Sequence, residues 1–133
     1  MVRKETFRGK TEEEMKGVGI EEFLPMLTSR ERRTMLRIKQ NPTFKKLVDK
    51  VRKLKEAGAS GKVIRTHARE AVILPEWLGM KFAVYNGKQF KEIEITVRML
   101  GRRLGDFAHS TGRVLHSGPG VGATRGSKFV PLK

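Results

Sequence analysis

Two strand-like runs separated by an Asn-Gly pair form the clearest hydrophobic pattern in the chain. Residues 82–85 are rich in strand-forming side chains, and residues 92–95 alternate polar and apolar, as a strand with one solvent-exposed side does. Asn86-Gly87 lies between them, and both residues tolerate the positive φ that a type I′ turn requires. The pattern therefore predicts a β-hairpin over residues 82–95.

The register of this hairpin indicates that its turn is longer than two residues. A strict two-residue turn at Asn86-Gly87 would place Phe82 opposite Lys91, an apolar residue opposite a polar one. We therefore expect a longer loop or a bulge near residues 88–90.

Helical spacing of apolar residues dominates much of the remaining chain. Residues 99–107 show this spacing and predict a helix after the hairpin, with Thr96 as its N-cap. Upstream, Asn41-Pro42 supplies an N-cap followed by proline at the first helical position. Apolar residues then recur at i, i+3, i+4, i+7 and i+10 over residues 44–54, and Gly58 suits the position just after the helix. We expect this apolar stripe to face further RNA or a neighbouring protein.

Two segments nearer the N-terminus carry the capping-box pattern, a threonine three residues before a glutamate. Thr11 with Glu14 predicts one short helix, and Thr28 with Glu31 predicts another. The second helix, over about residues 29–39, is rich in arginine and has few apolar residues to bury. Its surface therefore suits contact with phosphate better than packing against a core.

These elements together predict an α+β fold with a small antiparallel sheet of about three strands, including the Asn-Gly hairpin, flanked by helices. Extended, strand-forming residues between Lys62 and Leu74 supply the remaining strand. We divide the chain into a basic helical arm (1–58), an α+β core domain (59–110) and an extended, glycine-rich basic tail (111–133). The residues assigned to the core of the α+β domain are Trp77, Phe82, Val84, Ile93, Ile95, Leu100, Leu104 and Phe107.

Positive charge is in large excess and unevenly distributed. The 29 Lys and Arg residues against 14 Asp and Glu residues give a formal net charge of +15. Residues 1–26 carry −1, residues 28–58 carry +8, and residues 60–107 and 108–133 carry +4 each. Because self-repulsion on this scale destabilises a compact chain without counter-charge, the composition indicates a polyanionic partner, above all nucleic acid.

Other function classes lack the motifs that they need. The absence of cysteine excludes a disulfide framework and a thiolate zinc site, and no histidine pair has metal-ligand spacing. Apolar runs fall short of the roughly 20 residues of a membrane span. Without a signal-peptide pattern, a cytoplasmic location is expected. Residues 118–123 match the dinucleotide pattern G-x-G-x-x-A without its flanking strand and helix. We expect no cofactor, no metal and no enzymatic activity.

A set of residues at fixed spacing identifies a family. The set comprises Asn86-Gly87-Lys88, Leu100-Gly101, Leu104-Gly105-Asp106-Phe107 and, upstream, Ile64-Arg-Thr-His-Ala-Arg69 and Ile73-Leu-Pro-Glu76. With these residues the chain resembles the ribosomal small-subunit protein nineteen family, the universal S-nineteen family, called S-fifteen in eukaryotic numbering. The resemblance covers residues 60–133 most closely, and the ending over residues 120–133 is similar to that of archaeal and eukaryotic members.

The resemblance implies a place and a role in the ribosome. Members of the family sit in the head of the small subunit, where they bind the 3′ major domain of the ribosomal RNA (rRNA). They lie beside the small-subunit protein thirteen family, and their C-terminal tail runs toward the decoding region and bound tRNA. Their fold is α+β, and no catalysis is attributed to them.

Basic residues interleaved with small or aromatic ones are the predicted RNA contacts. Lys and Arg bind phosphate with release of counterions, and Arg also stacks on unpaired bases. The predicted rRNA contacts of the core and its exit are Lys62, Arg65, His67, Arg69, Lys81, Lys88, Arg98, Arg102, Arg103 and Arg113. Those of the arm are Arg30, Arg32, Arg33, Arg37, Lys45 and Lys46, and the residues expected near the decoding region or tRNA are Arg125, Lys128 and Lys133. For His67, stacking on a base and an ordinary surface position are equally open.

A second function class stays open on sequence alone, namely a chromatin-like protein that binds duplex DNA without preference for structured RNA. An RNA-modifying enzyme would need a cofactor loop or a metal cluster, and neither pattern is present. A membrane-binding basic helix is disfavoured because the basic part of the arm, residues 29–55, has no Trp and no Phe other than Phe44.

Overall fold

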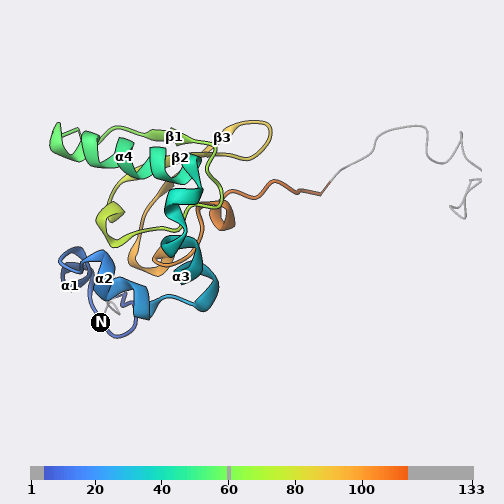
Figure 1. Ribbon diagram of the computed structural model, residues 1–133. Coiled ribbons are helices and arrows are strands. Elements are labelled where there is room, and N and C mark those ends of the chain that lie inside the picture. The colour runs from blue at the N-terminus through green and yellow to red at the C-terminus, as the bar shows by residue number, and fades with distance from the viewer. Residues whose placement is uncertain (1–4, 60, 114–133) are drawn as a thin grey trace, which may run out of the picture.

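The computed structural model of the protein describes residues 5–59 and 61–113, which form an α+β fold (Figure 1). Helices come first in the chain and the sheet follows them, as expected from the sequence. The helices are α1 (Glu12–Lys16), α2 (Ile20–Phe23), α3 (Ser29–Leu36) and α4 (Pro42–Glu56), and the strands are β1 (Ile64–Thr66), β2 (Lys81–Tyr85) and β3 (Phe90–Glu94). None of the described helices is long and apolar enough to span a membrane.

The sheet has the order β1-β2-β3 and is mixed, which corrects the expected antiparallel arrangement. β2 and β3 form the predicted antiparallel hairpin, but β1 pairs with β2 in parallel, with Ile64 opposite Phe82. The connection over residues 67–80 explains the difference. It returns along the sheet through buried extended residues 71–74 and a 3₁₀ turn at Pro75–Trp77, so β2 starts beside the start of β1.

The hairpin loop is longer than two residues, as the register predicted. Phe82 lies opposite Ile93 and Tyr85 lies opposite Phe90, which leaves residues 86–89 in the loop. The Asn86 side-chain oxygen accepts the backbone N–H groups of Lys88 and Gln89, at 3.0 and 2.9 Å. This Asx-type turn moves the strand partners by two residues and restores an apolar pair across the hairpin.

The helix predicted after the hairpin is absent, and that prediction was wrong. Residues 96–108 form two 3₁₀ turns, Val97–Met99 and Leu104–Phe107, and the side chain of Thr96 makes no capping hydrogen bond. Gly101 between the turns has a φ of +70°, which ends any regular helix. The backbone here bonds instead to the buried connection, since the N–H of Ile73 donates to the Arg102 carbonyl at 2.8 Å.

The N-terminal helices begin where the sequence predicts, with one change of role. Asn41 caps α4 by accepting the N–H of Phe44 at 3.1 Å, and Thr11 and Glu14 form the predicted capping contact at 2.7 Å. α3 begins after Thr28, but no capping box forms there. The carboxylate of Glu31 lies against Arg103 instead, because tertiary packing places that arginine beside the first turn.

Nearly all buried hydrophobic side chains of the described residues form one cluster that runs from Met15 to Ala108. The apolar stripe of α4 belongs to it, with Phe44 and Val51 fully buried. The stripe therefore faces the protein's own core, which corrects the expectation that it faces RNA or another protein. The residues assigned to the core are buried, except that Phe107 is only partly buried.

The tail beyond Arg113 lies outside the described residues. The predictions for Arg125, Lys128 and Lys133, and for an extended tail over residues 114–133, are therefore not addressed by the structure. Residues 110–113 have no regular secondary structure.

Candidate nucleic-acid interface

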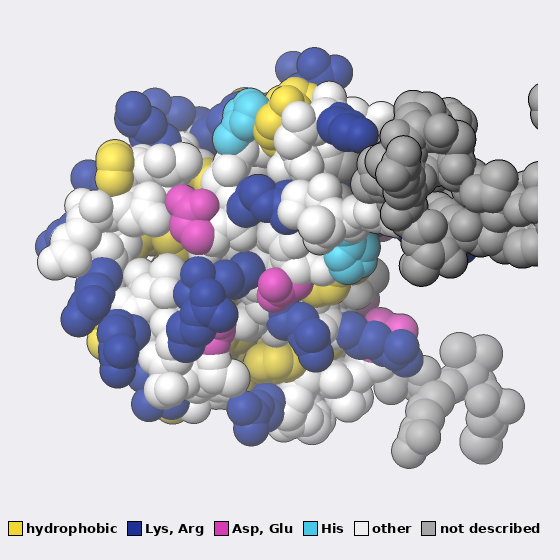
Figure 2. Space-filling model, turned by 90° about the vertical axis from the view of Figure 1, so that its right-hand side faces the viewer, with side chains coloured by type: hydrophobic (Ala, Val, Ile, Leu, Met, Phe, Trp, Pro, Cys, Tyr) yellow, Lys and Arg dark blue, Asp and Glu magenta, His cyan; other side chains and the backbone are white. Residues whose placement is uncertain are grey.

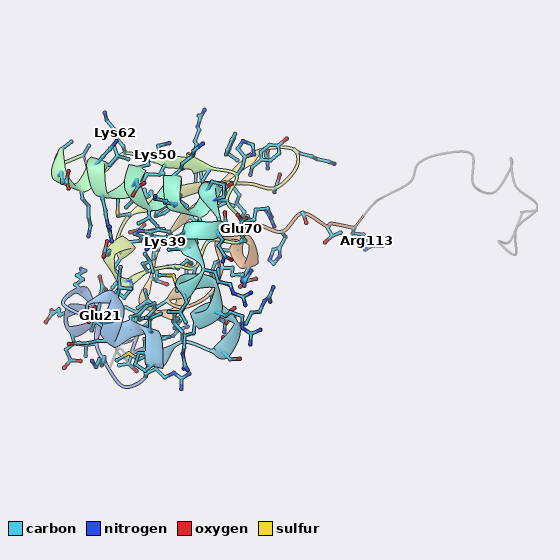
Figure 3. All side chains as sticks on the ribbon, viewed as in Figure 1. Glu21, Lys39, Lys50, Lys62, Glu70 and Arg113 are labelled. Atoms are coloured by element: carbon cyan, nitrogen blue, oxygen red, sulfur yellow. The ribbon has the colours of Figure 1, made fainter. Side chains whose placement is uncertain are left out.

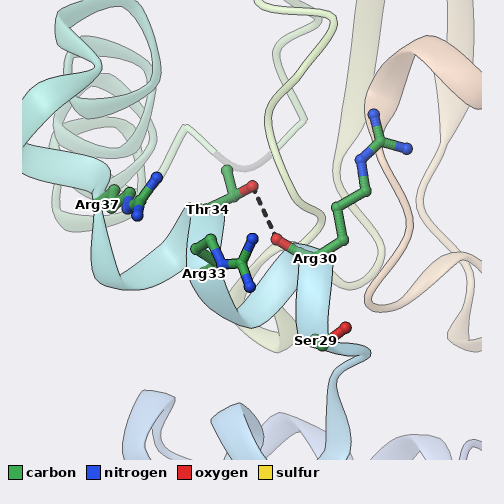
Figure 4. Close-up of a pocket in the computed structure, with 5 residues that line it drawn as sticks. All are labelled: Ser29, Arg30, Arg33, Thr34 and Arg37. Carbon is green, nitrogen blue, oxygen red and sulfur yellow. Dashed lines mark hydrogen bonds between the residues drawn. The ribbon is translucent and has the colours of Figure 1, made fainter.

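One side of α3 presents a hollow lined by arginine (Figure 4). Arg30, Arg33 and Arg37 recur at i, i+3 and i+7, and with Ser29 and Thr34 they line a space of about 230 Å³. All three arginines are exposed, and no described carboxylate lies within ion-pair distance of their guanidinium groups. The residues that line this site include three cationic donors and no carboxylate, so it suits an anion with several oxygens, such as phosphate.

Arg32 lies on the same helix and has a different role. Its guanidinium donates to the carbonyl oxygens of Leu24 and Leu27, both at 3.0 Å, and of Pro25 at 3.2 Å. Leu24 and Pro25 belong to the 3₁₀ turn after α2 and Leu27 is its C-cap; the Leu24 carbonyl also accepts the Leu27 N–H at 3.2 Å. Arg32 therefore attaches α3 to the turn that follows α2. Nothing in the sequence predicted this contact.

Arg102 and Arg103, adjacent in sequence, are separated by the structure. Arg102 is exposed, whereas the Arg103 side chain is only 18% exposed. Arg103 donates to the hydroxyl of Thr34 at 3.0 Å, and its Nε lies 3.6 Å from a carboxylate oxygen of Glu31. Arg103 thus connects the segment after the hairpin to α3, and Arg102 is the member of the pair that is open to a ligand.

Arg69 holds three separate segments together. Its guanidinium donates to the carbonyl oxygens of Tyr85, Gly105 and Ala108, with the Tyr85 contact at 2.7 Å. A Cβ on Gly105 would meet the Arg69 carbonyl oxygen at 3.0 Å, a tight contact that glycine avoids. These contacts give Arg69 a structural role, and its predicted contact with RNA stays a prediction.

The other predicted contacts of the core lie on the surface. Lys62, Arg65, Lys81, Lys88, Arg98 and Arg113 are exposed. Arg98 forms an ion pair with Glu5 at 3.0 Å. Lys81 in β2 lies directly opposite Glu94 in β3. His67 is exposed and lies against Tyr85, with 4.7 Å between ring centroids.

The solvent-facing side of α4 adds two lysines that were not among the predicted contacts. Lys46, Lys50 and Lys53 recur at i, i+4 and i+7, and with Asp49 and Leu54 they line a shallow groove of about 420 Å³. The helical spacing of Lys50 and Lys53, opposite the apolar stripe, could have predicted these contacts. It places both lysines together on the exposed side of the helix.

Acidic and basic side chains are concentrated in different parts of the molecule. The glutamates of α1 and α2 are exposed at one end, while α4 with its lysines lies on the opposite side, as the labelled Glu21 and Lys50 show (Figure 3). Figure 2 shows a face on which Lys and Arg side chains are spread widely, with few acidic side chains among them. Among the described residues, no group of His, Asp or Glu could hold a metal ion.

Comparison with known proteins decides the family. A family model described as Ribosomal protein S19 matches residues 37–116. The chain belongs to the ribosomal protein S19 family. This confirms the resemblance drawn from the hairpin and the residues that follow it.

Two archaeal relatives match nearly the whole chain, and each is named small ribosomal subunit protein uS19. The protein of Methanococcus maripaludis strain C7 is 47% identical over 130 residues, which cover 96% of this chain and 80% of the relative. That of Metallosphaera sedula is 42% identical over 131 residues, which cover 98% of this chain and 93% of the relative. Because the family model begins at residue 37, Arg30 and Arg33 lie outside it.

Proposed function

We propose that this S19-family protein is a structural constituent of the small ribosomal subunit and binds the ribosomal RNA of that subunit. Its family membership and the names of its relatives support the ribosomal role. The observation that carries RNA binding is the hollow on α3, where three exposed arginines lack a carboxylate partner among the described residues. No catalytic role is part of this proposal.

The mode of binding follows from the form of folded RNA. Its deep, narrow major groove hides the base edges, so a protein reads its shape and the positions of its phosphates. A framework held by Arg69 and Arg103 keeps the surface cations at fixed positions. Arg30, Arg33, Arg37 and the lysines of α4 then supply the phosphate contacts.

The finer placement follows the family resemblance. It comprises the 3′ major domain of the rRNA in the subunit head, a neighbour of the small-subunit protein thirteen family, and a location in the cytoplasm on the ribosome. Residues of the tail, including Arg125, Lys128 and Lys133, lie near the decoding region or tRNA in this proposal.

A salt titration of binding tests the interface. The triple variant Arg30→Gln/Arg33→Gln/Arg37→Gln should weaken binding to a 3′ major-domain RNA. The slope of log K against log salt should flatten by about 2–3, since each lost phosphate contact removes roughly 0.7–0.9. A matched control, Arg8→Gln/Lys10→Gln/Lys16→Gln, removes the same charge near the acidic end and should change the slope far less.

Competing nucleic acids distinguish RNA recognition from simple charge attraction. The rRNA fragment should outcompete an unrelated folded RNA and duplex DNA of equal length, and the preference should survive added salt. Equal binding to all three, lost together with salt, would instead favour the chromatin-like alternative. Equal slopes for the triple variant and its control would remove α3 from the interface.

A further inference from the structure

The three-stranded sheet has one buried face and one open face. Ile64, Phe82 and Ile93 are neighbours across the three strands and belong to the core. Side chains alternate along a strand, so the residues between them point to the other face. That face carries Arg65 from β1, Lys81, Ala83 and Tyr85 from β2, and Phe90, Glu92 and Glu94 from β3. Apart from Ala83, all of these residues are exposed or only partly buried.

Aromatic rings gather at one end of this open face. The His67 ring lies 4.7 Å from Tyr85 and 5.3 Å from Phe90, and Tyr85 lies 5.2 Å from Phe90, measured between ring centroids. The guanidinium carbon of Arg65 lies 5.6 Å from the centre of the Phe90 ring. The three rings contact one another at inclined angles, with 49° between the planes of His67 and Tyr85, 79° between His67 and Phe90 and 52° between Tyr85 and Phe90. They form an aromatic corner in which a base can stack on one ring and meet the others edge-on, with a cation beside it.

The tertiary fold holds this aromatic cluster in place. The Tyr85 hydroxyl donates to the Gly87 carbonyl at 2.8 Å, and the Tyr85 carbonyl accepts from Arg69 at 2.7 Å. Tyr85 and Phe90 are directly paired at the end of the hairpin, so neither ring depends on a mobile backbone for its position. Rings fixed in this way lose little conformational entropy when a flat ligand stacks on them.

Charge on the open face favours a nucleic-acid ligand at the aromatic end. Arg65 contacts the cluster and exposed Lys88 lies in the adjoining loop, whereas Glu92 and Glu94 lie further along β3. An unpaired nucleotide carries both a flat base and an anionic phosphate, which match rings flanked by cations.

We propose that His67, Tyr85 and Phe90 form a stacking site for one unpaired RNA base, with Arg65 beside it. This inference rests on the proposed RNA-binding function and adds a contact of a different kind. Stacking reads an unpaired base in a loop or bulge, whereas the arginines of α3 bind phosphates. The site assigns a role to Tyr85 and Phe90, which were not among the predicted contacts.

The test uses the full chain and a single-stranded RNA that contains 2-aminopurine, whose fluorescence falls when its base stacks on an aromatic ring. The variant His67→Leu/Phe90→Leu removes two rings and keeps apolar bulk. Its affinity for the single strand should fall about 5- to 30-fold with an unchanged salt slope, because stacking releases no counterions. The fluorescence quenching should also be reduced. Affinity for the same sequence as a duplex should not change.

Two controls separate loss of stacking from loss of structure. Phe7→Leu removes a partly buried ring at the opposite end of the molecule, 6.0 Å from Phe23, and should leave single-strand binding unchanged. Melting temperature checks the fold of each variant. If the double variant unfolds, the single variant His67→Leu at an exposed position decides the question.

The outcomes distinguish this site from the proposed function. Equal affinity and equal quenching for the wild type and the double variant would overturn the stacking site, even if rRNA is still preferred. If the double variant fails to enter the subunit although its RNA affinity is unchanged, the open face binds a protein partner. This result would also overturn the stacking site. A failure of rRNA to outcompete DNA would count against the proposed function alone. The stacking site is tested by comparing a single strand with a duplex, and that comparison does not depend on a preference for rRNA.

Discussion

At the scale of single residues, the arginines of this protein have different roles that depend on their surroundings. Arg32 and Arg69 donate several hydrogen bonds to backbone carbonyls of neighbouring turns, while Arg30 and Arg33 are exposed beside a hollow. The planar guanidinium makes the first task possible because it offers several donors in a fixed plane. A lysine has no equivalent geometry, so the structural arginines are the ones that resist replacement.

The substitution Arg69→Lys should reduce the free energy of unfolding by about 2–3 kcal/mol, because hydrogen bonds from a charged donor to three carbonyls are lost or weakened. Urea denaturation measures the change. Arg65→Lys is the control, since Arg65 is exposed, and should stay within about 0.5 kcal/mol of the wild type. Unchanged stability in Arg69→Lys, together with weaker RNA binding, would show that Arg69 acts mainly as an RNA contact.

At the scale of elements, α3 and α4 show how amphipathic character separates core from surface. α4 buries Phe44, Leu47, Val48 and Val51, which leaves its lysines on the outside. α3 buries only Met35, and its Leu36 is 69% exposed. Tertiary contacts such as the one between Arg103 and Thr34 therefore carry much of the attachment of α3.

The substitution Phe44→Ala tests the burial of the α4 stripe. It should lower the free energy of unfolding of the isolated protein by about 3–5 kcal/mol, because it leaves a cavity in the core. Leu36→Ala, the apolar control at an exposed position, should have little effect on stability. Guanidinium unfolding of the protein free of RNA provides the measurement. A stable Phe44→Ala protein that binds RNA poorly would mean that the stripe faces a partner after all.

At the scale of the whole molecule, one hydrophobic cluster unites the arm and the α+β segment. The cluster includes Met15 near one end of the described chain and Ala108 near the other. The acidic end at α1 and α2 and the basic side of α4 lie apart, so the molecule is electrostatically polar. A charged RNA surface should therefore orient the protein with α1 and α2 away from it.

Deletion of residues 118–133 should leave folding and RNA binding intact and impair translation. The described core closes at Ala108, and the predicted phosphate contacts of α3 and α4 precede it. Unfolding midpoint, rRNA affinity and translation by subunits that carry the shortened protein are the three measurements. A lower unfolding midpoint would show that the tail is part of the folded structure, and normal translation would remove its proposed role near the decoding region.

The sequence by itself determined the elements whose signals are local. The cap at Asn41, the stripe of α4 and the loop after Tyr85 follow from neighbouring residues, because capping, helical periodicity and turn chemistry act over a few positions. The family could also be recognised, since its residues stand at fixed spacing along one stretch of the chain.

The tertiary structure alone decided the features that join distant segments. The parallel pairing of β1, the loss of the helix near Gly101 and the separation of Arg102 from Arg103 all depend on the buried connection over residues 71–74. The backbone groups of that connection form hydrogen bonds with residues 101–104, and these bonds compete with a local helix. The spacing of apolar residues in the sequence does not reveal such competition. The aromatic cluster likewise exists only because the fold brings the end of β1 beside the hairpin.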